Sequence, residues 1–300
     1  MVNAASASVS ASPDSTFKFV SDLARELSRG RVELPSFPEA AARLQQVLSD
    51  DSVTSERIAL VISSDAGLAA RVLTLANSTL LHRGGPPVTN LKNAITRIGH
   101  EHIRTAALAY ANAQLRRAAE LAPIREQLES CWREGIRVAS LAHAIATESR
   151  RVRTDEAMLA GLVHNIGKVY LIARAARDAP GQPSFDERSL RPWYPSIGQA
   201  LIENWKLPDD IATAVGGQLD TERSHEGDPD LQDLLIVAVS MAAQMSAGVA
   251  EELVAPQEQD RGQDAAAMPA AAALGLNDSA LVRVMLEAQT DLEMLQAALG

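Results

Sequence analysis

The sequence is poor in cysteine, in aromatic residues and in long apolar runs, and each shortage excludes a class of protein. Its 300 residues include one cysteine, Cys131, which rules out an intramolecular disulfide and fits a reducing compartment. Aromatic residues make up 3% of the chain, so Leu, Val, Ile and Ala must build the core. No apolar stretch reaches the roughly 20 residues that span a bilayer, and residues 1–15 lack signal-peptide features. We therefore expect a cytoplasmic protein without a membrane span.

Positive charge is also in short supply. The chain has 28 Lys and Arg against 38 Asp and Glu, which gives a formal net charge of −10. A surface that binds nucleic acid relies on clustered Lys and Arg side chains, and the net field of this chain opposes one. We therefore expect no nucleic acid among its partners.

What the chain has instead is helical periodicity. Apolar residues recur at helical spacing over residues 123–149, 154–170 and 231–247, and alanine, which loses no side-chain entropy in a helix, is abundant. No strand pattern, glycine-rich nucleotide loop or internal repeat is present. The sequence predicts an all-α fold: a two-lobed helical bundle.

Changes in composition and periodicity along the chain predict its domain organisation. Residues 1–16 are rich in Ser and Ala without periodicity and indicate a disordered tail. We expect an N-terminal helical lobe over residues 17–118 and a second helical lobe over 119–250. Residues 251–275 are low in complexity and indicate a linker or mobile loop, and residues 276–300 a C-terminal helix.

The C-terminal helix has a short heptad seam. Its apolar positions alternate in spacings of four and three over about two and a half repeats; they are Leu281, Met285, Ala288, Leu292, Leu295 and Leu299. So short a seam is marginal for an independent coiled coil. We expect the helix to pack on its own domain, and a dimer through this helix is the alternative.

The stretch "GLVHNIGKVYL", residues 161–171, carries His164, Asn165 and Lys168 inside an apolar helix. Helical metal-dependent hydrolases need several His and Asp side chains that converge to hold a metal and activate water. Asn presents a neutral amide, a weaker ligand than a carboxylate and no general base. One His and one Asn therefore do not make a catalytic metal site.

Several motifs together resemble the HDOD family, a degenerate bacterial branch related to HD-type metal phosphohydrolases. They run from about Phe17 to Ala250 and include "LPSFPEAAARL", "DAGLAARVLTLANS", "NLKNAITRIGHEHIRTAAL", "CWREGIRVASLAHAIA", "GLVHNIGKVYL" and "IGQALIENWKLPDDIATAV". The "LANS" segment followed by the "AI…IG" helix is the most specific of these. The resemblance implies that the lobe at 119–250 is a degenerate HD-like helical bundle.

The resemblance also implies where active relatives would hold a metal. At those positions this chain has Glu134, His164, Asn165, Tyr194, Gln218 and Leu219, and only His164 keeps the expected residue. We therefore expect a vestigial pocket formed by Glu134, His164, Asn165, Lys168, Tyr194 and Gln218. It would hold no catalytic residue, no cofactor and no metal.

Each residue of this pocket also has a purely structural interpretation. We expect His164 to be a buried histidine hydrogen-bonded within its helix, in preference to a metal ligand. Lys168 could bind an anion, but we favour a solvated lysine. Glu134 could form an ion pair with Lys168.

A second set of candidates lies in the N-terminal lobe. Asp65, Asn77 and Ser78 should cap helix ends and are also candidates for an interaction surface, which we rank second.

The resemblance implies a non-catalytic signalling adaptor that acts through protein–protein contact. Its partners would be signalling proteins in trans: a response regulator, a sensor kinase or a cyclic-dinucleotide enzyme. Two alternatives stay open. One is a divergent phosphohydrolase that holds one metal with Glu134, His164 and His143. The other is a sensor that holds a nucleotide or another anion near His164 and Lys168.

Overall fold

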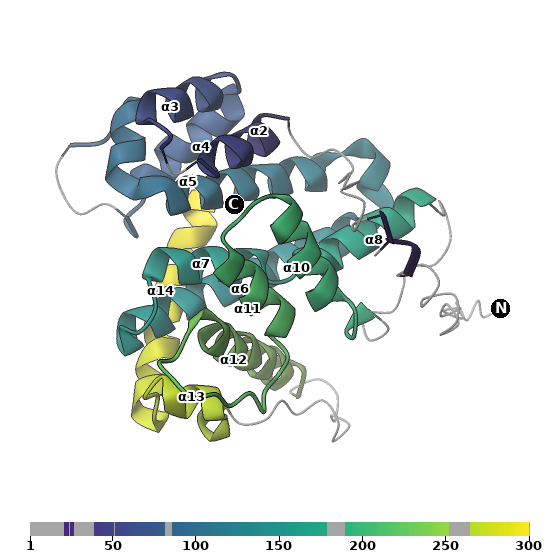
Figure 1. Cartoon of the computed structure of the whole chain (residues 1–300), viewed down its shortest axis with the longest axis vertical. Coiled ribbons are helices and arrows are strands. Elements are labelled where there is room, and N and C mark those ends of the chain that lie inside the picture. Colours follow the sequence, from purple (N-terminus) through teal and green to yellow (C-terminus); the bar gives the residue numbers. More distant parts are fainter. Residues whose placement is uncertain are drawn as a thin grey trace, which may run out of the picture.

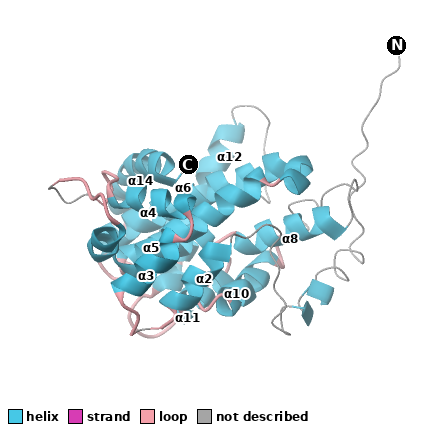
Figure 2. Ribbon diagram, turned by 90° about the horizontal axis from the view of Figure 1, so that it is seen from above, coloured by secondary structure: helices cyan, strands magenta, loops and turns pink. Residues whose placement is uncertain are grey.

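The structure, a computed structural model, describes residues 21–23, 25–26, 39–50, 52–81, 86–178, 190–251 and 265–299, with the backbone alone at 246–251. Figure 2 shows helices and loops and no strand in this part of the chain. The fold class predicted from the sequence, all-α, is confirmed. The predicted tail, residues 1–16, lies outside the described residues.

The N-terminal bundle combines four helices above the rest of the molecule (Figure 1). They are α2 (Glu39–Leu48), α3 (Ser55–Ser63), α4 (Ala66–Ala76) and α5 (Leu91–Arg117). Their apolar faces bury Leu44, Ile58, Leu75 and Ile103 in one shared core. Helix α5 kinks at Gly99, whose φ of 75° and ψ of 174° are not helical. A side chain would be strained at that positive φ, which accounts for the glycine.

The second bundle is organised around α6 (Arg125–Ser149), which follows the short 3₁₀ helix η1 (Ala119–Ile124). Helices α7 (Thr154–Val163), α8 (Ile166–Asp178) and α12 (Leu231–Glu251) contact α6, whereas α10 (Tyr194–Asn204) packs on α8, and α11 (Asp209–Gly217) packs on α10 and α12. Small residues of α6, such as Ala139 and Ala142, are fully buried and allow neighbouring helices to approach closely.

The C-terminal helix α14 (Asp278–Leu299) runs from the lower part of the molecule up to the N-terminal bundle (Figure 1). Its first half buries Leu281 and Val284 against the second bundle, and its last turn buries Leu295 and Leu299 in the N-terminal one. The predicted packing of this helix on its own chain is therefore confirmed. Of the predicted seam, Met285 is instead 45% exposed.

The prediction of a linker or mobile loop over residues 251–275 was wrong for its last part, from residue 265 onwards. Residues 265–267 form a 3₁₀ turn (η3, Ala265–Ala267), and Pro269–Ala273 form α13. Met268, Ala271 and Leu274 are buried in the core of the second bundle. An alanine-rich segment looks low in complexity, but small apolar side chains pack well between helices. Residues 252–264 lie outside the described part.

None of the helices in the described ranges is both long and apolar enough to cross a membrane.

Candidate functional site

The sequence predicted one continuous helix over residues 161–171. The structure has two helices there, and they meet at His164 and Asn165. The glycines on either side are sites of close approach. A Cβ at Gly161 would lie 2.6 Å from the Cα of Ala139 in α6. A Cβ at Gly167 would lie 2.0 Å from the carbonyl oxygen of Tyr194 in α10. The two glycines thus bring α6, α7, α8 and α10 together around His164.

His164 is a buried, neutral histidine. Its side chain is 1% exposed, and its Nδ1 lies 2.7 Å from the carbonyl oxygen of Gly161. Because that carbonyl can only accept, Nδ1 carries the proton and Nε2 is an acceptor. Burial lowers the pKa of His164 below its ordinary value of 6.5, so the ring is uncharged at neutral pH. The predicted burial and helical hydrogen bond of His164 are confirmed.

Glu134 and Lys168 form the ion pair that the sequence suggested. Lys168 Nζ lies 3.1 Å from Glu134 Oε2, and His164 Nε2 lies 4.0 Å from Oε1. Burial by itself would raise the pKa of Glu134, but neighbouring positive charge and two hydrogen bonds lower it below its usual value. Since His164 is neutral, Lys168 supplies that charge. The favoured prediction of a solvated Lys168 was wrong, because its side chain is 10% exposed and paired.

Asn165 acts in this site as a hydrogen-bond donor. Its Nδ2 donates to the carbonyl oxygen of Cys131 at 2.8 Å and lies 3.4 Å from Glu134 Oε2. A carboxylate at position 165 would face both of these acceptors with no proton to offer. An Asn at this position therefore suits the Glu134 carboxylate in α6, because its NH₂ group has protons to offer.

The remaining two pocket residues close the site from the other helices. Gln218, 1% exposed, donates from Nε2 to the carbonyl oxygen of His164 at 2.8 Å, at the break between α7 and α8. Burial, with a smaller contribution from the Glu134 charge, raises the pKa of Tyr194, so its hydroxyl stays protonated. The structure thus brings together all six predicted pocket residues.

The side-chain donors of this pocket do not fit a divalent metal. A metal needs three or four lone pairs directed at one point. Here Glu134 is bonded by Lys168, and Asn165 directs its NH₂ group inward. Of these side chains, His164 has the orientation usual for a metal ligand, because its Nδ1 bonds a backbone carbonyl and leaves Nε2 as an acceptor. Cys131 adds no thiolate, since burial raises its pKa to about 11.

His143 does not belong to this site. It lies nine residues after Glu134 in α6, which places it about 13 Å further along the helix axis. Its Nδ1 contacts Asp291 Oδ2 of α14 at 2.7 Å instead. The structure thus removes His143 from the ligand set that the phosphohydrolase alternative requires.

A second polar cluster lies where α12 begins. His225 Nε2 lies 2.8 Å from Asp233 Oδ2, and Arg223 bonds both Asp230 and Asp233. His225, Asp230 and Asp233 could together reach one metal ion. The guanidinium of Arg223 already bonds both carboxylates, so the cluster is explained as an ion-pair network that anchors the loop.

Asp65 has the capping role predicted for it. Its Oδ1 accepts from the backbone N–H groups of Gly67 and Leu68 at the start of α4, and Tyr110 of α5 donates its hydroxyl proton to the same carboxylate. Gly67 makes room for this contact, because a Cβ there would lie 2.7 Å from the Tyr110 ring.

Asn77 and Ser78 end α4. Asn77 bonds the N–H and C=O groups of Val88, and Ser78 donates to the carbonyl oxygen of Leu75. Both also line an open groove of about 680 Å³ between the end of α4 and the last turns of α14. Their role as an interaction surface stays a prediction.

The chain belongs to the HDOD domain family. The family model for the HDOD domain matches residues 34–220, which include Asp65, Glu134 and His164. A comparison with curated proteins found no match.

Solved structures share the fold. An HDOD domain protein of unknown function from Geobacter sulfurreducens superimposes with a TM-score of 0.59 at 20% identity, over 96% of this chain and 98% of that one. A protein from Shewanella amazonensis SB2B, named as a candidate metal-dependent phosphohydrolase, has a TM-score of 0.60 at 24% identity, over 87% and 99%. A candidate signal transduction protein from Marinobacter aquaeolei VT8 has a TM-score of 0.52 at 19% identity, over 98% and 69%. At these identities the likeness concerns the fold alone.

Proposed function

We propose that this protein is a non-catalytic HDOD signalling adaptor, whose function is carried by contact with other proteins. The observation that supports this most directly is the Glu134–Lys168–Asn165 network at the former metal position. The ammonium group of Lys168 and the amide NH₂ group of Asn165 occupy this position. They also contact the Glu134 carboxylate, which a metal here would need as a ligand. A pocket stabilised in this way has no metal-bound water to activate.

The partners in this proposal are signalling proteins in trans: a response regulator, a sensor kinase or a cyclic-dinucleotide enzyme. Family membership and the name of the Marinobacter aquaeolei relative support a signalling role. An acidic chain of this composition favours a protein partner over nucleic acid.

The two alternatives meet specific obstacles in the geometry. A phosphohydrolase would have to hold its metal with Glu134 and His164, because His143 is bonded to Asp291. A sensor of small anions would have to separate Lys168 from Glu134, since that ion pair uses the charge that the anion needs. Neither alternative gains a supporting contact.

Metal content tests the proposal. Elemental analysis of protein purified without chelators or a histidine tag should give much less than one equivalent of any transition metal. His164→Ala and His225→Ala variants form a matched pair, because each removes one histidine from one of the two polar clusters. Near-stoichiometric metal that disappears in His164→Ala and persists in His225→Ala would contradict the adaptor proposal. It would also justify assays with phosphate esters.

A further inference from the structure

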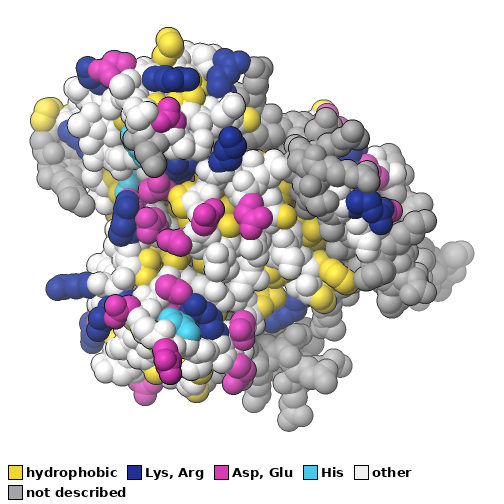
Figure 3. All heavy atoms as spheres, viewed as in Figure 1, with side chains coloured by type: hydrophobic (Ala, Val, Ile, Leu, Met, Phe, Trp, Pro, Cys, Tyr) yellow, Lys and Arg dark blue, Asp and Glu magenta, His cyan; other side chains and the backbone are white. Residues whose placement is uncertain are grey.

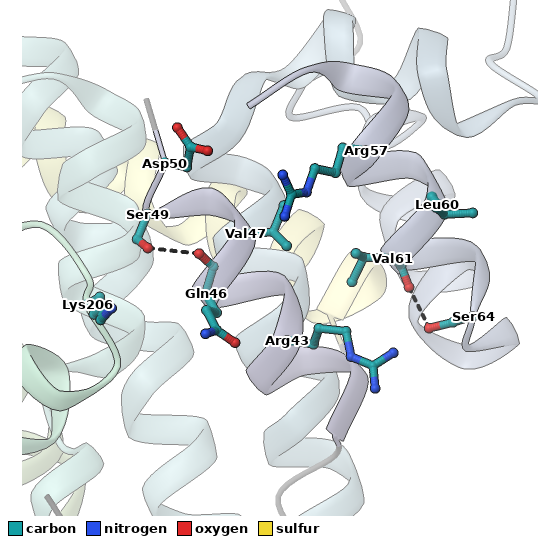
Figure 4. Close-up of a pocket in the computed structure, with 10 residues that line it drawn as sticks. All are labelled: Arg43, Gln46, Val47, Ser49, Asp50, Arg57, Leu60, Val61, Ser64 and Lys206. Carbon is teal, nitrogen blue, oxygen red and sulfur yellow. Dashed lines mark hydrogen bonds between the residues drawn. The ribbon is translucent and has the colours of Figure 1, made fainter. Parts of the chain in front are cut away.

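A groove of about 740 Å³ opens between α2 and α3 on the N-terminal bundle, and the turn after α10 forms one of its edges (Figure 4). Val47 of α2 and Val61 of α3 are half-buried in it. Leu60, beside Val61, is 71% exposed and is the most exposed large apolar side chain of the described residues. A single exposed leucine is ordinary, but this one extends the apolar lining of a groove.

The groove is basic although the chain is acidic. Its lining includes Arg43, Arg57 and Lys206 against one acidic residue, Asp50. Asp50 accepts from the backbone N–H and the hydroxyl of Ser52 and keeps its negative charge, so the lining has two more basic than acidic side chains. Figure 3 shows several Lys and Arg side chains and fewer Asp and Glu side chains over the N-terminal bundle, and side chains of both signs over the bundle below it. The groove thus has a surplus of basic side chains in a chain of net charge −10.

Lys206 reaches the groove from a backbone position that favours glycine. It follows α10 with a φ of 54°, in the left-handed region. The N–H of Leu207 bonds to the carbonyl oxygen of Ile202, and that of Lys206 to the carbonyl oxygen of Glu203. This is the Schellman arrangement, in which the residue at the position of Lys206 is usually Gly. A lysine there is a less stable choice than glycine, and its side chain is exposed at the groove edge.

We propose that this groove binds an acidic amphipathic helix of a partner protein. Apolar side chains of that helix would lie on Val47, Leu60 and Val61, and its carboxylates would face Arg57 and Lys206. The walls of the groove are helices, and the described part of the chain offers no strand edge to which an extended peptide could pair, so helix-in-groove recognition is the matching mode. This inference rests on the proposed adaptor function and supplies a surface and a class of partner for it.

Nucleic acid fits the groove less well. It would place phosphates near the three cations but would leave the Leu60 and Val61 surface without an apolar partner. The negative net charge of the whole chain would also weaken the association. An acidic helix satisfies the charged and the apolar parts of the groove at the same time.

A designed peptide tests this inference on the full chain. The probe is a fluorescein-labelled helical peptide with Leu on one face and Glu on the other, and the control peptide has every Glu replaced by Gln. By fluorescence anisotropy we expect the Glu peptide to bind and the Gln peptide to bind less tightly. Arg57→Glu and Leu60→Asp should each weaken binding about tenfold, whereas Arg151→Glu, an exposed charge reversal outside the groove, should not.

Lys206→Gly separates binding from folding. Because glycine suits the positive φ, this variant should keep or raise the melting temperature while it weakens peptide binding. A loss of affinity together with a retained melting temperature supports the proposal, since misfolding cannot explain it.

Three results would overturn the inference. The first is peptide affinity that is equal for both peptides or unchanged in Arg57→Glu and Leu60→Asp. The second is tighter binding of a homopolymeric RNA than of the Glu peptide. The third is self-association of the protein that Leu60→Asp abolishes, which would assign the groove to a second copy. None of these results bears on whether the protein holds a metal at His164. A failure of the groove inference is therefore distinguishable from a failure of the adaptor proposal.

Discussion

At the residue scale, the predicted vestigial pocket holds side chains that are matched to one another. Glu134 accepts from Lys168 and lies near the NH₂ group of Asn165, and the carbonyl of His164 accepts from Gln218. Each partner is a hydrogen-bond donor, and Lys168 also balances the negative charge of Glu134. Asn165, Lys168 and Gln218 are buried, so a change that removes the partner of any of them should be costly.

The protonation of His164 leads to a prediction on stability. Its folded-state pKa is lowered by burial, and the unfolded chain titrates near 6.5. Below pH 6.5 the unfolded state therefore binds a proton that the folded state excludes. The free energy of unfolding should fall as the pH decreases through this range, by at most about 1.4 kcal/mol per pH unit. His164→Asn keeps a donor for the Gly161 carbonyl but cannot titrate.

We expect urea unfolding at pH 7.5 and 5.5 to show a smaller difference for His164→Asn than for the unsubstituted protein. This comparison cancels the titration of groups that do not interact with His164; Glu134 does interact with it. Equal differences in the two proteins would mean that His164 has the same pKa in the folded and the unfolded chain, which would contradict a pKa lowered by burial.

At the scale of the element, α14 contains two leucines in opposite environments. Leu295 is fully buried in the core of the N-terminal bundle, and Leu286 is 69% exposed. Both are in the same helix, so a change to alanine alters helix propensity equally at the two positions.

Leu295→Ala should lower the free energy of unfolding by about 2–5 kcal/mol, because it leaves a cavity where α14 meets the N-terminal bundle. Leu286→Ala is the matched control and should change it by less than about 0.5 kcal/mol. Guanidinium unfolding followed by circular dichroism measures both. Similar effects of the two substitutions would contradict the orientation of α14.

At the scale of the whole molecule, shared helices connect the three apolar cores. Helix α6 places Leu141 in the core of the second bundle, Ile136 in that of the N-terminal bundle, and Leu128 in a third core beside α8. Helix α14 contributes to the first two of these. The two predicted lobes therefore share elements, and neither has an apolar core made by its own helices alone.

Cooperative unfolding follows from this sharing. Chains of this length commonly unfold in several steps, but here we expect one transition. Trp132 lies in the core of the N-terminal bundle, and Trp205 and Trp193 pack against the other two cores. Tryptophan fluorescence and far-ultraviolet circular dichroism should therefore give coincident denaturation curves. A curve with two phases, or a fluorescence midpoint apart from the dichroism midpoint, would show that the lobes unfold separately.

Local sequence patterns were sufficient for much of the fold. Asp65 and Asn77 mark helix ends through short-range hydrogen bonds, and the apolar periodicity of α6 needs no partner to be recognised. The alanine-rich segment before α14 was misjudged because composition does not reveal which small side chains have a core to pack against. Lys168 was misjudged for a related reason: its burial depends on Glu134, which is 34 residues away in the chain.

The sequence by itself determined that this protein is helical, that it carries the HDOD motifs and that the residue after His164 is a poor metal ligand, because these properties belong to single residues and to their local spacing. Tertiary structure alone decided that Glu134, Lys168 and Asn165 satisfy one another, that His143 faces α14, and that Arg57, Leu60 and Lys206 line one groove. These contacts join residues from different helices, and their geometry is set by how the helices pack. Helix periodicity specifies which face of a helix is apolar, but it does not specify which other helix covers that face.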